Sequence, residues 1–428
     1  MPGFGASAAG GSSSAHGAST VAAVMSSSVG VTSAPLPITS VPFPRSPSQL
    51  PRHMGGVTAD MGGRPRHPLP PPHNASSGAY YHGGGRQGSG YQGGDVGVVQ
   101  IILVIMEQLQ SRIDEESHGD NLIATLPTRE GWSTPLTLFK KCWLRPQVLK
   151  NCLPVQDKFM PRSEDIILAT HPKCGTTWLK ALAFAITNRV HYALADHPLL
   201  KKNPHKVVTI IEAQFLSERG GDLDYIESLP SPRLLATHLP LSLLPSGVCK
   251  AGCRIVYLCR EPKDAFTSMW HFENKVRKGD PISLDEAFNM FCEGCSSFGP
   301  FWDHYLQYWK ENLARPQEVL FLKYEEIMLD PLKAVRKIAK FLDFPFTEEE
   351  ESRGVDKELV RFCSFEVLSN LDANKTGGVE RPGNMFIEHS SLFRKGEVGD
   401  WVNHMSKEMG EKLDMLIEEK FKGSGLQF

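Results

Sequence analysis

The sequence predicts a single α/β domain with a mostly parallel central sheet and helices on both faces, preceded by a disordered extension. Two observations support the domain. Short apolar runs typical of buried strands alternate with helical patterns between residues 120 and 428, and this alternation is typical of parallel sheets covered by helices. One such run leads into a turn suited to phosphate binding. A third observation supports an extension over residues 1–110, because most of it, residues 1–94, is of low complexity and has no periodic apolar face.

The extension is of low complexity and is expected to be disordered. Residues 1–94 are rich in Gly, Ser, Ala and Pro and contain few acids, so they cannot bury enough apolar surface to offset the entropy of ordering. The alternatives are a transit peptide and an extension produced by gene prediction or exon fusion. The apolar run at residues 96–106 is too short to span a bilayer and would fit a short helix.

Four apolar runs predict the strands of the sheet. They cover residues 166–170, 234–237, 254–258 and 319–322. The clearest helix is predicted over residues 331–342, where apolar side chains recur on one face. A domain of about 300 residues is within the usual range for a single core.

The first run ends beside a predicted anion site. Lys173, Cys174 and Gly175 form a turn between this strand and a helix that opens on Thr176 and Thr177. The free N–H groups of a helix's first turn and the positive end of its dipole attract anions, and Lys173 adds a full charge. This combination indicates a site for a phosphate or sulfate group.

The loop is P-loop-like but differs from the nucleotide P-loop. That motif has the order G-x-x-x-x-G-K-[ST], whereas Lys173 precedes Gly175 and no earlier glycine is in place. Taken alone, the segment could also be an ordinary β-turn-α corner.

A second segment predicts a further anion contact. Arg260 follows the strand at 254–258, and Ser268 lies about two helical turns later. The guanidinium group is well shaped to bind a phosphate. The alternative is an ion pair of Arg260 with Glu261 or Asp264, and Asp264 could also cap or charge the first turn of the helix.

A third segment contains Arg394, Lys395 and Gly396 near the C-terminus. Glycine allows close approach of a ligand to the backbone. In isolation, such a pair of cations is usually a solvated turn.

Together these segments resemble the cytosolic sulfotransferase family, specifically its plant branch. The family pattern P-K-[SC]-G-T-T-W is matched by residues 172–178, R-x-P-K-D-x-x-x-S-x-[WY]-H-F by residues 260–272, and R-K-G-x-x-G-D-W by residues 394–401. The resemblance extends from about Leu126 to the C-terminal helix, roughly seven tenths of the chain.

The resemblance implies a sulfotransferase that uses 3′-phosphoadenosine 5′-phosphosulfate (PAPS), releases 3′,5′-adenosine bisphosphate (PAP) and needs no metal. It also implies a set of donor-binding residues: Lys173, Cys174, Gly175, Thr176, Thr177, Trp178, Arg260, Ser268, Tyr324, Arg394, Lys395 and Gly396. Within this set, the loop from Lys173 would hold the 5′-phosphosulfate, Trp178 would stack on the adenine and Tyr324 would contact the nucleotide.

The resemblance assigns the general base to His238. This residue follows the strand at 234–237, and the carboxyl ends of strands are where α/β sheets present ligand-binding residues. A lone His after a strand is more often structural, but within the family pattern T-H-L-P it resembles the catalytic base. It would accept the acceptor's hydroxyl proton, while Lys173 stabilises charge on the leaving oxygen.

Three departures from the family pattern affect these expectations. Cys174 stands where many relatives have Ser, so any hydroxyl contact is lost while the backbone donors remain. Cys363 stands where animal members of the family have a Thr near the nucleotide, so the side-chain contact of that Thr is not expected here. The dimerisation segment K-x-x-x-T-V-x-x-x-E is kept only at Glu411 among its key positions, so a monomer is expected more than a dimer.

Composition agrees with a soluble enzyme, and a cytoplasmic location is expected. The net charge of −2 and pI of about 6.7 argue against nucleic-acid binding, and no membrane partner is expected. Nine cysteines without a repeating framework suit a reducing compartment.

Two other functions stay open at this stage: a P-loop-type kinase, and a non-catalytic interaction protein. A small hydroxylated acceptor such as a flavonoid, steroid or jasmonate-like metabolite is expected, without a choice among these classes. Trp143, Phe215, Phe272 and Phe386 could line its pocket or belong to the core.

Overall fold

The computed structural model describes residues 100–101, 104, 106, 119–216, 223–381 and 385–428. The extension at 1–94 and most of the apolar run at 96–106 lie outside these residues. Residues 89–428 group into one compact unit, and the following description concerns this unit alone.

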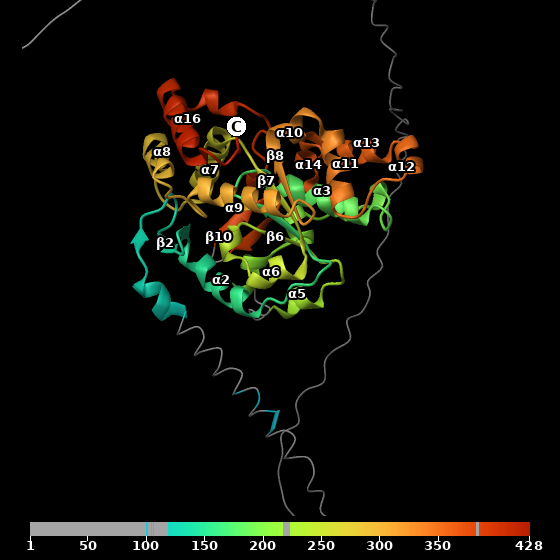
Figure 1. Ribbon diagram of the computed structural model, residues 1–428, viewed down its shortest axis with the longest axis horizontal. Coiled ribbons are helices and arrows are strands. Elements are labelled where there is room, and N and C mark those ends of the chain that lie inside the picture. Colours follow the sequence, from blue (N-terminus) through green and yellow to red (C-terminus); the bar gives the residue numbers. More distant parts are fainter. Residues whose placement is uncertain (1–99, 102–103, 105, 107–118, 217–222, 382–384) are drawn as a thin grey trace, which may run out of the picture. The chain divides into compact units, whose positions relative to one another are not determined.

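A five-stranded parallel sheet forms the centre of the unit (Figure 1). Its strands lie in the order β5 (Thr209–Ile210), β6 (Leu234–Thr237), β4 (Ile166–Thr170), β7 (Arg254–Cys259) and β8 (Val319–Lys323). The four strands predicted from the sequence are confirmed, and β7 and β8 each extend one residue further. The order places β4 between β6 and β7, with Leu168 opposite both Ala236 and Val256.

The remaining strands form two small antiparallel sheets. One contains β1 (Thr128–Arg129), β2 (Leu136–Phe139) and β3 (Cys142–Leu144), and the other pairs β9 (Gly378–Arg381) with β10 (Met385–Glu388). The predicted mostly parallel sheet is therefore confirmed, and the antiparallel strands lie outside it.

Helices cover both faces of the central sheet. The α-helices are α2 (Pro146–Lys158), α3 (Thr176–Asn188), α4 (Pro204–Val207), α5 (Asp224–Ser228), α6 (Ser246–Ala251), α7 (Pro262–Val276), α8 (Leu284–Cys292), α9 (Phe301–Ala314), α10 (Tyr324–Leu329), α11 (Pro331–Phe341), α12 (Glu348–Ser352), α13 (Val355–Phe362), α14 (Phe365–Asn370), α15 (Asp372–Lys375) and α16 (Lys407–Phe421). The 3-10 helices are η1 (Leu194–Asp196), η2 (Pro198–Leu200), η3 (Ile211–Leu216), η4 (Leu241–Leu243), η5 (His389–Leu392) and η6 (Asp400–Asn403). Helix α11 ends one residue before the predicted boundary.

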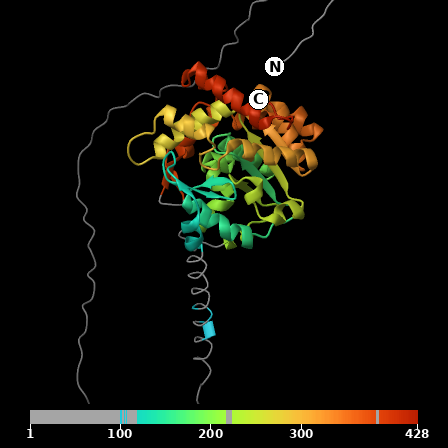
Figure 2. The ribbon, with the colours of Figure 1, turned by 60° about the vertical axis from the view of Figure 1, so that its left-hand side comes forward.

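Alternation along β4 separates two hydrophobic cores. Ile166 and Leu168 pack with α3, α11 and α13, whereas Ile167 and Ala169 pack with α2, α7, α9 and α16. Successive strand residues point to opposite faces of a sheet, and all four of these side chains are buried. In Figure 2, the C-terminal helix α16 (red) lies beside the yellow helices α7 and α8, which it contacts.

Helix α7 begins as the sequence suggests but is capped by a different residue. Pro262 occupies its first turn, and the Glu261 carboxylate accepts the backbone N–H of Asp264 at 3.0 Å. Of the two roles expected for Asp264, it places a charge in the first turn but does not cap the helix, because its carboxylate accepts backbone N–H groups from the C-terminal segment.

Candidate active site

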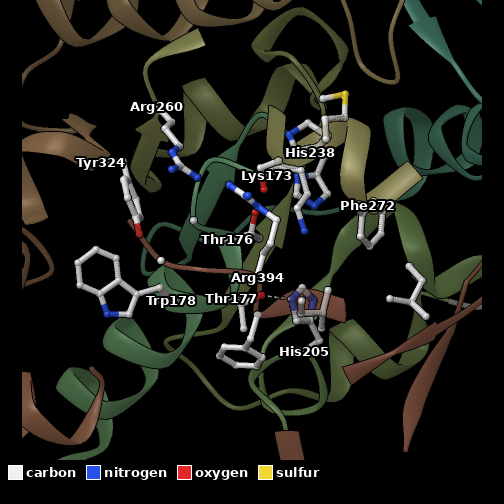
Figure 3. A pocket seen from close by; sticks show the side chains of 18 of the residues that line it. Lys173, Thr176, Thr177, Trp178, His205, His238, Arg260, Phe272, Tyr324 and Arg394 are labelled. Atoms are coloured by element: carbon white, nitrogen blue, oxygen red, sulfur yellow. Dashed lines mark hydrogen bonds between the residues drawn. The ribbon is translucent and has the colours of Figure 1, made fainter. Parts of the chain in front are cut away.

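Four neighbouring strands each deliver one polar residue to the same edge of the sheet. Lys173 follows β4, His238 follows β6, Arg260 follows β7 and Tyr324 follows β8. These residues line a cavity of about 330 Å³, and Figure 3 shows their side chains together. The carboxyl ends of parallel strands share one edge of a sheet, which explains how residues so distant in sequence meet.

The cavity brings together every predicted site residue except Cys174. The lining residues from that set are Lys173, Gly175, Thr176, Thr177, Trp178, His238, Arg260, Ser268, Tyr324, Arg394, Lys395 and Gly396.

The turn before α3 is tight and left-handed. Lys173 has a φ of 67° and Gly175 a φ of 101°. A Cβ atom on Gly175 would lie 3.0 Å from Cδ2 of Tyr324 and 3.1 Å from Cδ2 of Leu258, so this position favours glycine on both counts. No side chain caps α3 at Gly175, and its first-turn N–H groups are therefore suited to binding an anion.

Lys173 lies in a setting that disfavours its own charge. Its Nζ atom is 4.3 Å from the ring centroid of Phe272. Burial, followed by repulsion from Arg394 and Arg260, lowers the pKa of Lys173 to about 7. An anion in the cavity would reverse both effects, because it would replace lost solvation and offset the neighbouring cations.

The two loop hydroxyls are already oriented by other side chains. Thr176 Oγ1 lies 2.7 Å from Oγ1 of Thr170, at the end of β4. Thr177 Oγ1 lies 2.9 Å from Nε2 of His205, a contact drawn in Figure 3. No sequence pattern indicated that His205 belongs to the site.

Cys174 points away from the cavity. Its thiol is fully buried, with Sγ 3.2 Å from the Tyr305 hydroxyl oxygen. Burial raises the pKa of Cys174 to about 12, so the sulfur stays protonated. Any contribution of Cys174 to ligand binding must therefore come from its backbone.

Arg260 joins the strand ends to the C-terminal segment. Its guanidinium donates to the Asp264 carboxylate at 3.2 Å and to the Glu397 carbonyl at 2.5 Å, and it lies 4.7 Å from the ring centroid of Tyr324. The ion pair anticipated as an alternative is thus present, but it is buried. Nε of Arg260 has no partner among the described residues, so the guanidinium retains donor capacity next to the cavity.

The C-terminal segment adds two cations. Arg394 donates to the Asp400 carboxylate, and Lys395 reaches the same carboxylate at 2.5 Å. Burial opposes ionisation of Asp400, but the hydrogen bonds from Lys395 and Arg394 prevail and hold its pKa well below the usual range. Nε of Arg394 is also without a partner in the described part of the chain.

Gly396 has a φ of 70°. A Cβ atom there would lie 2.5 Å from Cδ2 of Phe365. Both the backbone conformation and this close contact favour glycine at position 396.

The His238 ring is held in one tautomer. Its Nδ1 lies 2.9 Å from the carbonyl oxygen of Thr170, and since a carbonyl only accepts, Nδ1 carries the proton. Nε2 is left as an acceptor. Burial lowers the pKa of His238 to about 3, the hydrogen bond to Thr170 opposes this shift, and Lys180 and Arg381 add to it. The ring is therefore neutral near pH 7.

Two buried groups fix the backbone that carries His238. The Glu212 carboxylate accepts the backbone N–H of His238 at 2.6 Å and the Thr237 hydroxyl at 2.9 Å. His304 Nε2 donates to the His238 carbonyl at 2.9 Å, and Tyr257 donates to Nδ1 of His304 at 2.8 Å. No sequence pattern identified Glu212 or His304, because each contacts His238 across more than twenty residues.

Aromatic side chains near His238 agree only in part with expectation. Phe272 lines the cavity, and so does Phe298, which lies 5.5 Å from the His238 ring and was missed. Trp143 and Phe386 are not among the lining residues, and Phe386 is 56% exposed. The side chain of Phe215 lies outside the described part of the structure.

The described residues offer neither a metal-binding cluster nor a membrane-spanning helix. They contain no cluster of three or more His, Cys, Asp or Glu side chains that could hold a metal ion. None of their helices combines the length and apolar character needed to cross a membrane.

Comparisons with known proteins place this site in a family. Residues 163–425 match the sulfotransferase domain family. Cytosolic sulfotransferase 17 of Arabidopsis thaliana is 44% identical over 314 residues, which are 72% of this chain and 90% of the relative. Cytosolic sulfotransferase 5 of the same plant is 44% identical over 75% of this chain and 100% of the relative. The relatives' names agree with the expected cytoplasmic location.

Solved structures agree with the sequence comparisons. An Arabidopsis thaliana protein proposed to be a steroid sulphotransferase aligns with a TM-score of 0.57 and 38% identity, covering 72% of this chain and 94% of that one. Mouse sulfotransferase SULT7A1, solved in complex with PAP, aligns with a TM-score of 0.53 and 26% identity over 68% and 95% of the two chains. The chain belongs to the plant cytosolic sulfotransferase family and is an enzyme that transfers sulfuryl groups.

Proposed function

We propose that this enzyme transfers the sulfuryl group of PAPS to a hydroxyl of a small-molecule acceptor, with His238 as general base. Sulfuryl transfer follows from membership of the family, whereas the donor, the base and the acceptor class rest on the residues around the cavity. The observation that carries the proposal is the pairing of a cation and a neutral base in one cavity. Lys173 and His238 follow adjacent strands there, and Nε2 of His238 is free to accept a proton.

The residues at the cavity fit a donor with two anionic ends. On the 5′ side, Lys173 and the first turn of α3 offer donors, and Gly175 leaves no room for a side chain. On the 3′ side, Nε of Arg260 and Nε of Arg394 each have no partner among the residues that the structure describes, and Ser268 and Lys395 line the cavity beside them. The PAP bound by the mouse relative supports the same choice of nucleotide.

Trp178 is the proposed adenine contact. Its ring lies 5.7 Å from that of Tyr324 in an edge-to-face arrangement, and both residues line the cavity. A flat aromatic base would add stacking to this pair.

His238 is proposed to take the acceptor's hydroxyl proton at Nε2. Bound PAPS supplies the sulfuryl group and a bisphosphate leaving group. The Thr170 carbonyl holds Nδ1–H, so the ring stays in the tautomer that can accept a proton and is oriented for it. Glu212 and His304 fix the backbone of His238, and such preorganisation lowers the cost of reaching the reactive geometry.

Lys173 is proposed to stabilise the negative charge that develops on the leaving oxygen. A buried cation aimed at developing charge is worth more than one in water, because little solvent screens it. The pKa of about 7 in the free protein means that ligand binding itself helps to maintain the charged form.

The proposed catalytic domain covers residues 120–428, and the matched family region at 163–425 lies within it. A small hydroxylated acceptor is the proposed partner. The monomeric state and the lack of nucleic-acid and membrane partners stay predictions.

The purified chain incubated with sulfur-labelled PAPS and a panel of hydroxylated acceptors tests this proposal. We expect a labelled product that forms equally well in EDTA. A P-loop-type kinase would instead consume ATP and require magnesium, and a non-catalytic protein would bind PAP without turning over any acceptor. Transfer that persists in the His238→Ala variant at the parent rate would refute the assignment of the base.

A further inference from the structure

Arg381, the last residue of β9, is a cation in the cavity wall. It is half-buried and lines the cavity together with His238 and Phe272. Burial lowers the pKa of Arg381 to about 10, with only Glu212 opposing the shift. Arginine remains charged even so. A positive charge is therefore held in a poorly solvated wall of the site.

Most other cations of the cavity are paired with carboxylates. Within the described part of the chain, a carboxylate lies within 3.2 Å of each of Arg145, Arg260, Arg394 and Lys395. Lys173 and Arg381 have no ion pair there. Lys173 belongs to the proposed donor loop, which leaves Arg381 as the cavity cation outside that loop with no carboxylate partner among the described residues.

Glu212 does not supply that counter-charge by contact. Its two carboxylate oxygens accept the backbone N–H of His238 and the Thr237 hydroxyl. The described ion pairs include none between Glu212 and Arg381. The carboxylate acts on Arg381 only at a distance, and it is committed to holding the catalytic strand end.

The hydrogen bond that Arg381 makes is dispensable to its partner. Nη2 of Arg381 lies 3.2 Å from Nδ1 of His205, and Nζ of Lys180 lies 3.2 Å from the same atom. Nδ1 offers one lone pair. Lys180 is fully buried and also donates to the Val208 carbonyl at 3.0 Å, so it stays in place when Arg381 turns to another acceptor.

Apolar residues surround this cation. Val379 lines the cavity two residues before Arg381 on the same strand, and Met385 and Ile387 of the paired strand line it too. Residues i and i+2 of a strand share one face. With Phe298 beside His238, the wall offers apolar contact for most of an acceptor and one charge for a polar end.

We propose that Arg381 binds a carboxylate of the acceptor, so that the preferred substrates are hydroxylated carboxylic acids with an apolar body. The inference rests on the proposed function, since it places the acceptor's hydroxyl at His238. A single guanidinium matches the planar, singly charged carboxylate in a bidentate pair. A doubly charged phosphate would call for several cations, as at the donor end of the cavity.

Matched acceptors test this preference in the full chain. Each pair would combine one hydroxylated acid with its primary amide, across 4-hydroxyphenylpropionic acid, hydroxylated cinnamic acids and hydroxylated fatty acids of graded length. For the best pair we expect kcat/KM to be about tenfold to a hundredfold higher for the acid, the range for one charge-assisted contact. A parent enzyme that prefers the amide, or treats both alike, in every pair would overturn the proposal.

The variant Arg381→Gln assigns the preference to this side chain. We expect its loss on the acid to exceed its loss on the amide by about tenfold or more, mainly through KM, and Arg381→Lys to restore part of the difference. Arg353→Gln is the matched control, because Arg353 is exposed and lies 3.6 Å from Glu349 on the surface. Equal losses on acid and amide in Arg381→Gln would mean that Arg381 only supports His205.

A binding measurement separates this inference from the proposed reaction. Calorimetry with PAP present would compare the acid and amide on the parent and Arg381→Gln chains, without any transfer step. Tighter binding of the acid that is lost in the variant supports the carboxylate site even if no acceptor is sulfated. Sulfation of neutral acceptors with no acid preference in binding would retain the proposed function and remove this inference.

Discussion

The Asp264 carboxylate accepts the backbone N–H of Gly399 at 2.7 Å, although the two residues lie 135 positions apart. The same carboxylate accepts the N–H of Trp401 at 3.0 Å and pairs with Arg260 at 3.2 Å. One buried side chain thus connects the segment after β7 with the C-terminal segment that carries Arg394. The two halves of the proposed 3′-phosphate site are held together through Asp264.

Asp264→Asn should loosen this connection. The amide keeps the shape of the side chain but loses its charge, and it presents an NH2 group in place of one of the two oxygens that accept backbone N–H groups. We expect PAP affinity to fall about tenfold, with a lower Tm, because a buried charge-assisted network is broken. Calorimetry and thermal melts would measure this, with Asp280→Asn on an exposed loop as control. Unchanged PAP affinity would show that the C-terminal segment positions itself without Asp264.

His238→Ala should lower turnover by roughly two to four orders of magnitude, the usual range for loss of a general base. PAP binding should stay close to that of the parent, because the ring faces the acceptor side and its backbone is held by Glu212. Steady-state rates with labelled donor and calorimetry with PAP would measure both. A structural role would instead reduce affinity and Tm together.

The pH dependence should reflect Lys173 rather than His238. The pKa of His238 is lowered to about 3, so its neutral, proton-accepting form dominates from about pH 5 upward. The pKa of Lys173 is lowered to about 7, and its charged form is lost as the pH rises through that value. We therefore expect kcat/KM, which reports the free enzyme, to decline above about pH 7.

Lys173→Arg provides the check on this assignment, because its guanidinium remains charged and should move the decline to higher pH. A decline at the same pH in that variant would assign it to another group.

The two sides of the donor site should respond differently to different nucleotides. Arg260→Ala should weaken PAP binding by about 1.5–3 kcal/mol and hardly affect 5′-AMP, which lacks the 3′-phosphate. Lys173→Ala should reduce turnover more than PAP affinity, because its contact is proposed to strengthen as the reaction proceeds. Calorimetry on both nucleotides decides this. Equal losses for PAP and 5′-AMP in Arg260→Ala would mean that Arg260 supports the fold or the 5′ side rather than the 3′-phosphate.

Removal of residues 1–94 should leave the Tm and turnover near those of the full chain. Their composition provides no apolar face that could pack on a folded domain. Parallel melts and rate measurements on the two chains would test this. A decrease of many degrees on truncation would show that the extension contributes to the fold.

The strand ends were predictable from sequence because local patterns specify them. Short apolar runs followed by polar residues placed Lys173, His238 and Arg260 at one edge of the sheet, and the structure agrees. The supporting contacts had no such signal. Glu212 and His304 act on His238 through pairings across distant segments, and no periodicity in a single chain encodes those.

The same limit explains why the sequence did not show where the side chains of Cys174 and Asp264 point. Cys174 lies inside a matching motif, but its side-chain direction depends on the left-handed turn at Lys173 and Gly175. Asp264 lies in the first turn of α7, yet its carboxylate turns to Gly399 and Trp401. A motif specifies which residues are present, while long-range packing decides where their side chains point.

The span of the site along the chain has a consequence for biosynthesis. The donor loop ends at Trp178 and the last proposed nucleotide contact is Gly396, about 220 residues later. At typical ribosomal speeds these emerge roughly 10–45 s apart. A nascent chain that exposes the first loop still lacks the C-terminal cations, so nucleotide should bind tightly only to finished molecules, and in the cell it would stabilise completed enzyme rather than assist its early folding.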